Sequence, residues 1–375
     1  MAKLFDYSKI AEGKHFVGRD DEVKRLSSDF IFLTNTAIIA PEGWGKSSLV
    51  HKAASDAMHK EKALRFCFTD LSNVRNEERF YELLVQGVLK AVSRNQSEVV
   101  ENVKKYFCST SPRVTFDTEG SFTVDFDWED IRRNQDELID LPFVVAKDKG
   151  LKLVVCIDDF NAIGRFSDPD GLLERLKNRW KRHEDVTYCI CASPVSFVDK
   201  FLKSVPMFYR YGDIIHIGHV SRKDMVGSLR EKFADSARYL DNEIAGLIYD
   251  MVGGNAFYTQ QLAHLSWLGT SVVCSREVVV QSFETIVDQM DMVFRNITGS
   301  LTTQQLCYLH AVIAGETVIS TSEVLHRHHI TSATSASRSK AALLERGIVY
   351  NSDGRIFMTD PVYSYWLKNR FFNNR

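Results

Sequence analysis

The segment Ala40-Pro-Glu-Gly-Trp-Gly-Lys-Ser-Ser48 constrains the fold more than any other stretch of the sequence. It follows the strand-like run Thr36–Ala40 and leads into the helical pattern Lys46–His59, so a glycine-rich loop joins a strand to a helix. Such a loop directs backbone N–H groups and the positive end of the helix into one small cavity, which suits a polyphosphate. The pattern is one residue short of GxxxxGK[ST], because Ala40 stands at its first glycine.

Three residue types in this loop have defined chemical roles. Gly45 lets the backbone approach a β-phosphate, Lys46 supplies charge for the β- and γ-phosphate oxygens, and Ser47 offers a hydroxyl to Mg²⁺. The methyl group of Ala40 is compatible with this geometry if its φ stays negative. A chance glycine-rich turn is the alternative, but the flanking strand and helix favour a phosphate loop. The predicted nucleotide-binding residues of the loop are Pro41, Glu42, Gly43, Trp44, Gly45, Lys46, Ser47 and Ser48.

The region from about 30 to 217 alternates short apolar runs with longer amphipathic ones. Strand, helix and strand in alternation indicate an α/β fold in which a parallel sheet is covered by helices on both faces. The segment 113–128 alternates polar and apolar residues around Glu119-Gly120, which predicts an inserted hairpin. Further strands are predicted at Ala63–Phe68, Leu153–Ile157 and Thr187–Ala192, and further helices at Glu77–Arg94 and Leu172–Lys181.

Two adjacent acids end the apolar strand Val154-Val-Cys-Ile-Asp-Asp159. In a P-loop enzyme the first acid, here Asp158, orders the shell of Mg²⁺, and the second, here Asp159, acts as general base for the attacking water. An ordinary pair of acids at a strand end is the alternative, and the phosphate loop favours the catalytic interpretation. Asp159 is one methylene shorter than the more usual glutamate, so we expect slow hydrolysis.

Ser193 ends the strand Thr187–Ala192 and is a candidate contact for the γ-phosphate, although a helix-cap or turn role is equally open. The sequence has no Asn-Lys-x-Asp motif for reading guanine, so ATP is preferred over GTP. It also lacks a kinase glycine loop and an HRD triplet.

The remainder of the chain has two further patterns. A helical region from about 221 to 294 begins at Ser221, which has Asp224 three residues later as in a variant capping box. The region after Leu301 has the order of a winged helix. It reads as helices at Thr303–Ala314, Ser320–His328 and Ala336–Arg346, a break at Gly347, and a hairpin at 348–358.

The 375 residues are enough for two or three domains. The formal net charge of −2 gives no bulk reason to expect binding to nucleic acid or membrane. The cysteines are scattered through apolar runs, as in reduced core thiols, and neither an apolar leader nor a membrane span is evident, so we expect a cytoplasmic protein. The predicted domains are an α/β domain at 1–217, a helical lid at 218–295 and a winged helix at 296–375.

Four motifs occur in the order of one family: Phe16-Val-Gly-Arg19, Ile157-Asp-Asp-Phe-Asn161, Gly253-Gly-Asn-Ala-Phe-Tyr258 and Asp360-Pro-Val-Tyr-Ser-Tyr-Trp-Leu367. Over nearly its whole length the chain resembles the archaeal-type ATPases of the STAND class, which are AAA+-related P-loop proteins. The resemblance implies an AAA+-like α/β domain, a helical lid and a C-terminal winged helix. It also implies that Phe16, Val17, Gly18 and Arg19 border the adenine, although Arg19-Asp-Asp-Glu22 could simply begin a helix.

The chain departs from the family pattern near the expected γ-phosphate. Ala256 replaces the proline of the lid motif, and Asp159 and Asn161 are shorter than the usual glutamate and glutamine. Arg210 stands where the α/β domain meets the lid, as either a γ-phosphate contact or an ion-pair partner of Asp213.

The winged-helix region carries eight Lys and Arg against five Asp and Glu. Its third helix offers Ser335, Ser337, Arg338, Ser339 and Lys340 to DNA, and a protein client is the alternative. The sequence thus predicts an ATP- and Mg²⁺-dependent ATPase that repositions its winged helix and that can form oligomers. The alternative is a nucleotide-stabilised DNA-binding or protein-docking scaffold with little or no turnover.

Overall fold

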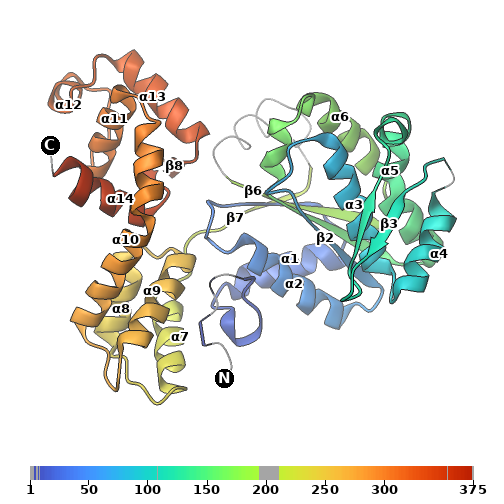
Figure 1. Ribbon diagram of the computed structural model, residues 1–375, viewed down its shortest axis with the longest axis horizontal. Helices are drawn as coiled ribbons and strands as arrows, with labels where there is room; N and C mark the ends of the chain where they lie inside the picture. The colour runs from blue at the N-terminus through green and yellow to red at the C-terminus, as the bar shows by residue number, and fades with distance from the viewer. Residues whose placement is uncertain are drawn as a thin grey trace.

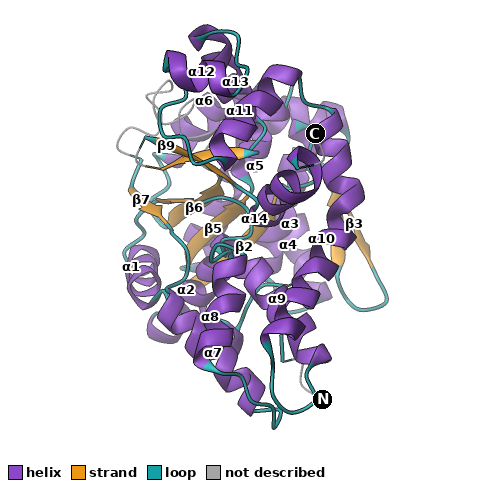
Figure 2. Cartoon of the chain, turned by 90° about the vertical axis from the view of Figure 1, so that its left-hand side faces the viewer, coloured by secondary structure: helices purple, strands orange, loops and turns teal. Residues whose placement is uncertain are grey.

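A five-stranded parallel sheet forms the centre of the first domain. The computed structural model describes residues 4, 5, 7, 9–107, 109–193, 211–352 and 354–373. All neighbouring strands of this sheet are parallel, and the order is β2-β5-β6-β1-β7. Figure 2 labels four of them, from β7 on the left through β6 and β5 to β2. The edge strand β7 was not predicted. The strands are β1 (Thr36–Ile39), β2 (Leu64–Asp70), β5 (Lys152–Asp158), β6 (Val186–Ala192) and β7 (Asp213–His216).

Helices cover both faces of this sheet, which confirms the predicted α/β architecture (Figure 1). Alternation along β5 explains the two layers, because Val154 and Cys156 enter one core while Val155 and Ile157 enter the other. The first core is closed by α1 (Asp20–Ile31) and α2 (Lys46–Lys60). The second is closed by α3 (Glu77–Val92), α5 (Trp128–Lys149) and α6 (Pro169–Trp180).

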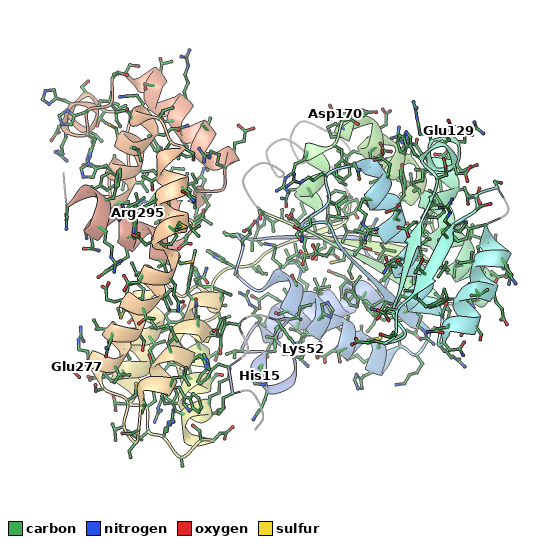
Figure 3. All side chains as sticks on the ribbon, viewed as in Figure 1. His15, Lys52, Glu129, Asp170, Glu277 and Arg295 are labelled. Carbon is green, nitrogen blue, oxygen red and sulfur yellow. The ribbon has the colours of Figure 1, made fainter. Side chains whose placement is uncertain are left out.

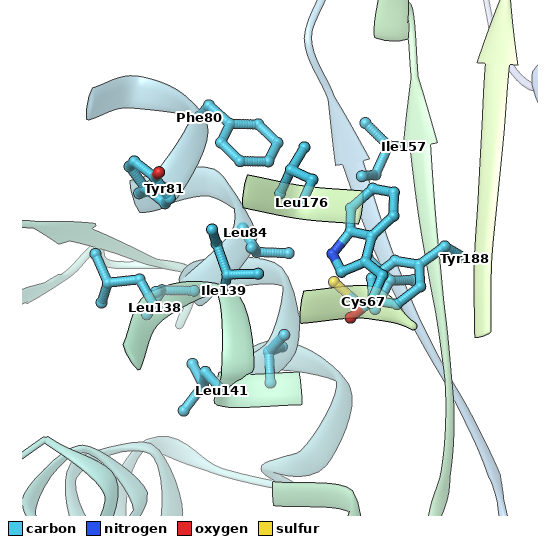
Figure 4. Close-up of a cluster of buried hydrophobic side chains, with 14 of the residues drawn as sticks. Cys67, Phe80, Tyr81, Leu84, Leu138, Ile139, Leu141, Ile157, Leu176 and Tyr188 are labelled. Atoms are coloured by element: carbon cyan, nitrogen blue, oxygen red, sulfur yellow. The ribbon is translucent and has the colours of Figure 1, made fainter. Parts of the chain in front are cut away.

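The second core is rich in large side chains. Figure 4 shows Phe80, Leu84, Ile139, Leu176 and Tyr188 among the residues that fill it. The indole of Trp180, within the basic run Lys177–His183, stacks on Tyr188 with ring centroids 3.9 Å apart and is 4 % exposed, so a core residue anchors this run. His183, from the same run, is also buried and bonds to the hydroxyl of Tyr188.

The predicted insertion is an antiparallel hairpin of β3 (Arg113–Phe116) and β4 (Phe122–Asp125). Gly120 takes a φ of 87° at its turn. The hairpin ends earlier than expected, because Asp127 caps α5 by accepting from the Glu129 N–H, and Trp128 is already helical. An unpredicted helix, α4 (Gln96–Tyr106), precedes the hairpin.

Four helices follow the α/β domain: α7 (Arg222–Ala234), α8 (Asn242–Met251), α9 (Ala256–Gly269) and α10 (Arg276–Gly299). Ser221 caps α7 by accepting from the Asp224 N–H, as its sequence predicts. Figure 1 shows that α10 runs from this lid into the last domain. It therefore continues across the boundary that we placed at 295–296, and the domain limits stay predictions.

The last domain has the helix and strand order of a winged helix. Gly347 adopts a φ of 67° where the third helix ends, and the wing hairpin follows it. Arg338 is exposed, but Ser339 is 5 % exposed and faces the core, so its predicted role at a DNA surface is wrong. Among the described residues, no helix has both the length and the apolar character to cross a membrane. The elements are α11 (Thr303–Ile313), α12 (Ser322–Arg327), α13 (Ala333–Glu345), β8 (Val349–Ser352), β9 (Arg355–Met358), α14 (Pro361–Trp366) and the π-helix Leu367–Phe372.

Candidate functional site

A cavity of about 600 Å³ lies where the predicted phosphate loop meets the lid. The loop contributes Glu42 to Ser48, and the ends of β2 and β5 contribute Asp70, Asp158 and Asp159. The N-terminal segment forms another wall, which includes Phe16, Val17 and His15; His15 is labelled beside the lid in Figure 3. The cavity is lined from the lid side by Val220, Met225, Ala256, Phe257 and Gln260.

The loop adopts a conformation that its glycines allow. Gly43 and Gly45 have φ of 75° and 86°, in the left-handed region, whereas Ala40 is outside that region. Ala40 instead continues the sheet, with its N–H donating to the Ala192 carbonyl at 3.2 Å. A Cβ on Gly43 would lie 3.3 Å from the amide nitrogen of Asn255, so this position has little room for a side chain. Because Ala40 lies outside the left-handed region and continues the sheet, its methyl group leaves the loop intact.

Lys46 begins α2, and its ammonium group turns back onto the loop. Its Nζ donates to the carbonyl oxygens of Ala40 at 2.7 Å and Pro41 at 3.1 Å. Burial lowers the pKa of Lys46, and the nearby Cys191 and Asp158 partly oppose this shift. A buried cation that bonds to neutral carbonyls has a strong electrostatic reason to accept an anion in the cavity.

Ser47 and Asp158 come together from α2 and β5. The Ser47 hydroxyl donates to the Asp158 carboxylate, although the two residues are 111 positions apart in the sequence. A hydroxyl and a carboxylate side by side are the oxygen donors that a hard cation such as Mg²⁺ prefers. These residues therefore fit the metal that the sequence predicts.

Asp159 also lines the cavity, in a left-handed conformation with φ of 49°. Its N–H donates to the Asp158 Oδ1 at 2.9 Å, so the turn after β5 holds the Asp158 carboxylate in place. Ser193 lines the cavity too, and its N–H donates to the Asn161 Oδ1 at 3.2 Å. The end of β6 is thereby tied to the turn that carries Asp159.

Arg210 lies outside the described residues. Its alternative partner, Asp213, accepts a hydrogen bond from the Arg25 Nε at 2.6 Å. Arg25 also supplies a second bond to the same carboxylate.

Arg19 stabilises the phosphate loop through hydrogen bonds from its guanidinium group. It is 8 % exposed and starts α1 with a left-handed φ of 65°. Its guanidinium donates to the carbonyls of Trp44 at 2.8 Å and Gly218 at 2.7 Å. Phe16, Val17 and Arg19 all line the cavity, whereas the lining does not include Gly18 or Pro41. Gly18 packs against the start of α7 instead, where an added Cβ would approach Asp224.

Our sequence reasoning missed Asp70, Met225 and Gln260, which also line the cavity. Asp70 pairs in register with Asp158 at the end of the neighbouring strand. Gln260 stands four residues after Ala256 on α9 and so shares its helix face. That spacing after the lid motif is the signal that could have identified Gln260.

Lys232, on α7, is a buried hydrogen-bond partner of Gln260. It is 6 % exposed, and its Nζ donates to the Gln260 Oε1 at 2.8 Å. Burial lowers the pKa of Lys232 from 10.5 to about 8. Between these two pH values the unfolded chain keeps a proton that the folded chain has lost. This group therefore makes the folded state more stable as pH rises through that window.

We expect the Lys232→Met variant to be more stable than the wild type at pH 7, because it removes a buried charge. Its advantage should shrink towards pH 10, by up to about 1.4 kcal/mol per pH unit in the free energy of unfolding. Denaturant unfolding of both proteins across this range measures the difference. The wild-type value must be subtracted because other buried groups also change the stability with pH. Burial raises the pKa of thiols such as those of Cys67 and Cys156, which makes the folded state less stable as pH rises. A difference that stays constant with pH would contradict the prediction.

Comparisons with known proteins agree with this geometry. Residues 16–262, well over half of the chain, match the model of a family described as "ATPase domain predominantly from Archaea". Residues 292–369 match a model described as "probable winged helix domain". A search of curated proteins found no match.

Several solved structures share the fold. The Walker-type ATPase paby2304 of Pyrococcus abyssi superposes with a TM-score of 0.71 at 13% identity, covering 98% of this chain and 100% of that one. The Aeropyrum pernix ORC2 protein gives 0.54 at 14% identity, with 98% of each chain covered. The Aeropyrum pernix ORC1 protein, in complex with DNA, gives 0.51 at 13% identity, covering 96% of this chain and 95% of that one. At such identities the likeness concerns the fold.

Proposed function

Since the chain belongs to the family of ATPase domains found predominantly in Archaea, we propose that it is an ATP-binding, Mg²⁺-dependent ATPase that acts as a conformational switch. In this proposal, hydrolysis between the α/β domain and the lid repositions the C-terminal winged helix. The observation that carries it is that the phosphate loop contacts both of the C-terminal domains.

The lid contact comes from the start of α9. The Phe257 N–H donates to the carbonyl of Gly43 at 3.4 Å, and the Asn255 amide packs against the same glycine. One residue later, the Tyr258 hydroxyl donates to the Asp360 Oδ2 at 2.7 Å. Asp360 in turn caps α14 by accepting from the N–H groups of Val362 and Tyr363. A short series of contacts therefore runs from the loop, through the lid, to the winged helix.

The second contact is direct. The indole of Trp44 packs edge-to-face on Tyr350 of the wing, with ring centroids 5.6 Å apart. A second aromatic contact of Trp44 is with His219, in the segment that leads into the lid, with ring centroids 3.8 Å apart. Trp44 is 8 % exposed, so a change in the loop backbone must also move these aromatic neighbours.

For hydrolysis, Lys46 would exchange its two carbonyl partners for phosphate oxygens, while Ser47 and Asp158 would hold Mg²⁺. The metal supplies positive charge that neutralises these oxygens. Asp159 would accept a proton from the attacking water as the water oxygen bonds to the γ-phosphorus and the bond to the β–γ bridging oxygen breaks. Ser193 would contact the γ-phosphate from the neighbouring strand. Loss of that phosphate would relax the loop and its contacts to the lid and wing.

Hydrogen exchange tests this coupling. We expect Mg·ATP to change the exchange of the wing, Val349–Met358, in the wild type but not in Lys46→Ala. Lys52→Ala is the matched control, because Lys52 is on the same helix, pairs with Asp56 and is absent from the cavity lining (Figure 3). Tyr350→Ala should keep the protection of the loop and lose the response of the rest of the wing. Nucleotide binding that leaves the wing's exchange unchanged would rule out the switch.

A nucleotide-stabilised scaffold is the second candidate, and the winged helix favours it. Arg338 on α13 is exposed and Lys340 is half-buried, so this helix presents positive charge at the surface, where DNA or a protein could bind. The ORC1 protein of similar fold was solved in complex with DNA. In this case nucleotide binding would persist while phosphate release stayed at the level of Lys46→Ala.

A further inference from the structure

The buried Lys232 fixes the orientation of the amide of Gln260, a residue that lines the cavity. An ammonium group can only donate hydrogen bonds, so the partner at 2.8 Å must be the amide oxygen. The amide NH₂ consequently points the other way, where it reaches the Met225 Sδ at 3.6 Å. A thioether is a weak acceptor, so at least one N–H remains available for a stronger partner.

The surroundings of Gln260 make this N–H important. The lid side of the cavity is contributed by Val220, Met225, Ala256, Phe257 and Gln260, and Gln260 is the only one of these five with a polar side chain. Flat apolar walls with one polar group suit a nucleobase. Gln260 is 8 % exposed and held by a buried partner, so its amide has little freedom to rotate and offer its oxygen.

We propose that Lys232 is a positioning residue that makes the site select adenine by occupying the Gln260 oxygen. The two bases differ at ring position 1, where adenine has an unprotonated nitrogen that accepts a hydrogen bond and guanine has an N1–H that donates one. The Gln260 N–H can therefore bond to adenine N1, whereas the N1–H of guanine would face this N–H and find no acceptor, because the Gln260 oxygen is occupied by Lys232. A buried donor left without a partner is costly, so guanine is disfavoured. This inference rests on the proposed nucleotide binding and assigns its base selectivity.

Two substitutions separate this role from a general structural one. Lys232→Met frees the amide oxygen, so the amide can rotate and serve guanine. Gln260→Glu keeps a partner for Lys232 but turns an oxygen, rather than an N–H, towards the base. Lys223→Met is the matched control, because Lys223 is exposed on the same helix.

Displacement of N-methylanthraniloyl-ADP by ADP and by GDP measures the preference. We expect the wild type and Lys223→Met to prefer ADP, and Lys232→Met to narrow the ADP-to-GDP affinity ratio by about tenfold. Gln260→Glu should weaken ADP binding and strengthen GDP binding. It tests the inference by itself if Lys232→Met fails to fold.

The failures are distinguishable. Wild-type protein that binds neither nucleotide would defeat the proposed function, and this inference with it. ADP binding in the wild type, combined with an unchanged ratio in either folded variant, would overturn this inference and leave the proposed function standing.

Discussion

Alanine at position 46 is expected to abolish the thermal stabilisation that Mg·ATP gives to the wild-type protein. A ligand present at about a hundred times its Kd stabilises a folded protein by about 2.7 kcal/mol, which raises Tm by several degrees in a chain of this size. Lys46 is the cation that would contact the β- and γ-phosphates, so its loss removes the strongest attraction to the polyphosphate.

The unliganded variant should melt close to the wild type. The Lys46 ammonium group bonds to two neutral carbonyls, and burial already disfavours its charge, so removing it leaves no unpaired carboxylate. Differential scanning fluorimetry with and without millimolar Mg·ATP measures both effects. Lys52→Ala should respond to nucleotide as the wild type does. An unimpaired shift in Lys46→Ala would show that nucleotide binds elsewhere.

Asparagine at position 159 is expected to stop hydrolysis and leave nucleotide binding intact. The amide is almost the same size as the carboxylate but cannot accept the proton of the attacking water. General-base catalysis typically contributes a factor of about 10² to 10⁴, so phosphate release should fall by at least about 100-fold. The backbone bond from Asp159 N–H to Asp158 Oδ1 does not involve the altered side chain, so the metal site should keep its geometry.

Single-turnover phosphate release, with affinity measured in parallel, separates the two properties. Asp170→Asn is the matched control, because this exposed residue in the first turn of α6 is remote from the cavity lining (Figure 3). Phosphate release at the wild-type rate in Asp159→Asn would show that Asp159 is not the general base. Asp70, which lies opposite Asp158 at the end of β2, would then be the next carboxylate to test.

Prediction from the sequence was most successful for the parts of the molecule whose residues are adjacent in the chain. A strand, a glycine-rich loop and a helix are adjacent in the chain at 36–60, and the loop's chemistry depends on its own backbone. The strand that ends in Asp158 and Asp159 was recognisable for the same reason. The four-residue edge strand β7 carries too short a pattern to stand out. In α5, Pro142 and the non-helical Asn134 interrupt the helical pattern.

The contacts between domains could not be predicted, because they join residues with no local pattern in common. Nothing in the loop sequence indicates that Trp44 packs on Tyr350, about three hundred residues later. Lys232 and Gln260 are a polar pair from two helices, and each one alone is an ordinary helical residue. The lid motif and the motif at 360–367 were visible, but the bond between Tyr258 and Asp360 that connects them was not.

Calorimetric titration of the full chain with ATP, first with Mg²⁺ and then with the metal chelated, tests the central claim most directly. If the loop and the Ser47–Asp158 pair form one metal-nucleotide site, the titration will show one saturable site per chain, with weaker binding after chelation. Absence of binding at millimolar ATP, or an affinity indifferent to the metal, would contradict it.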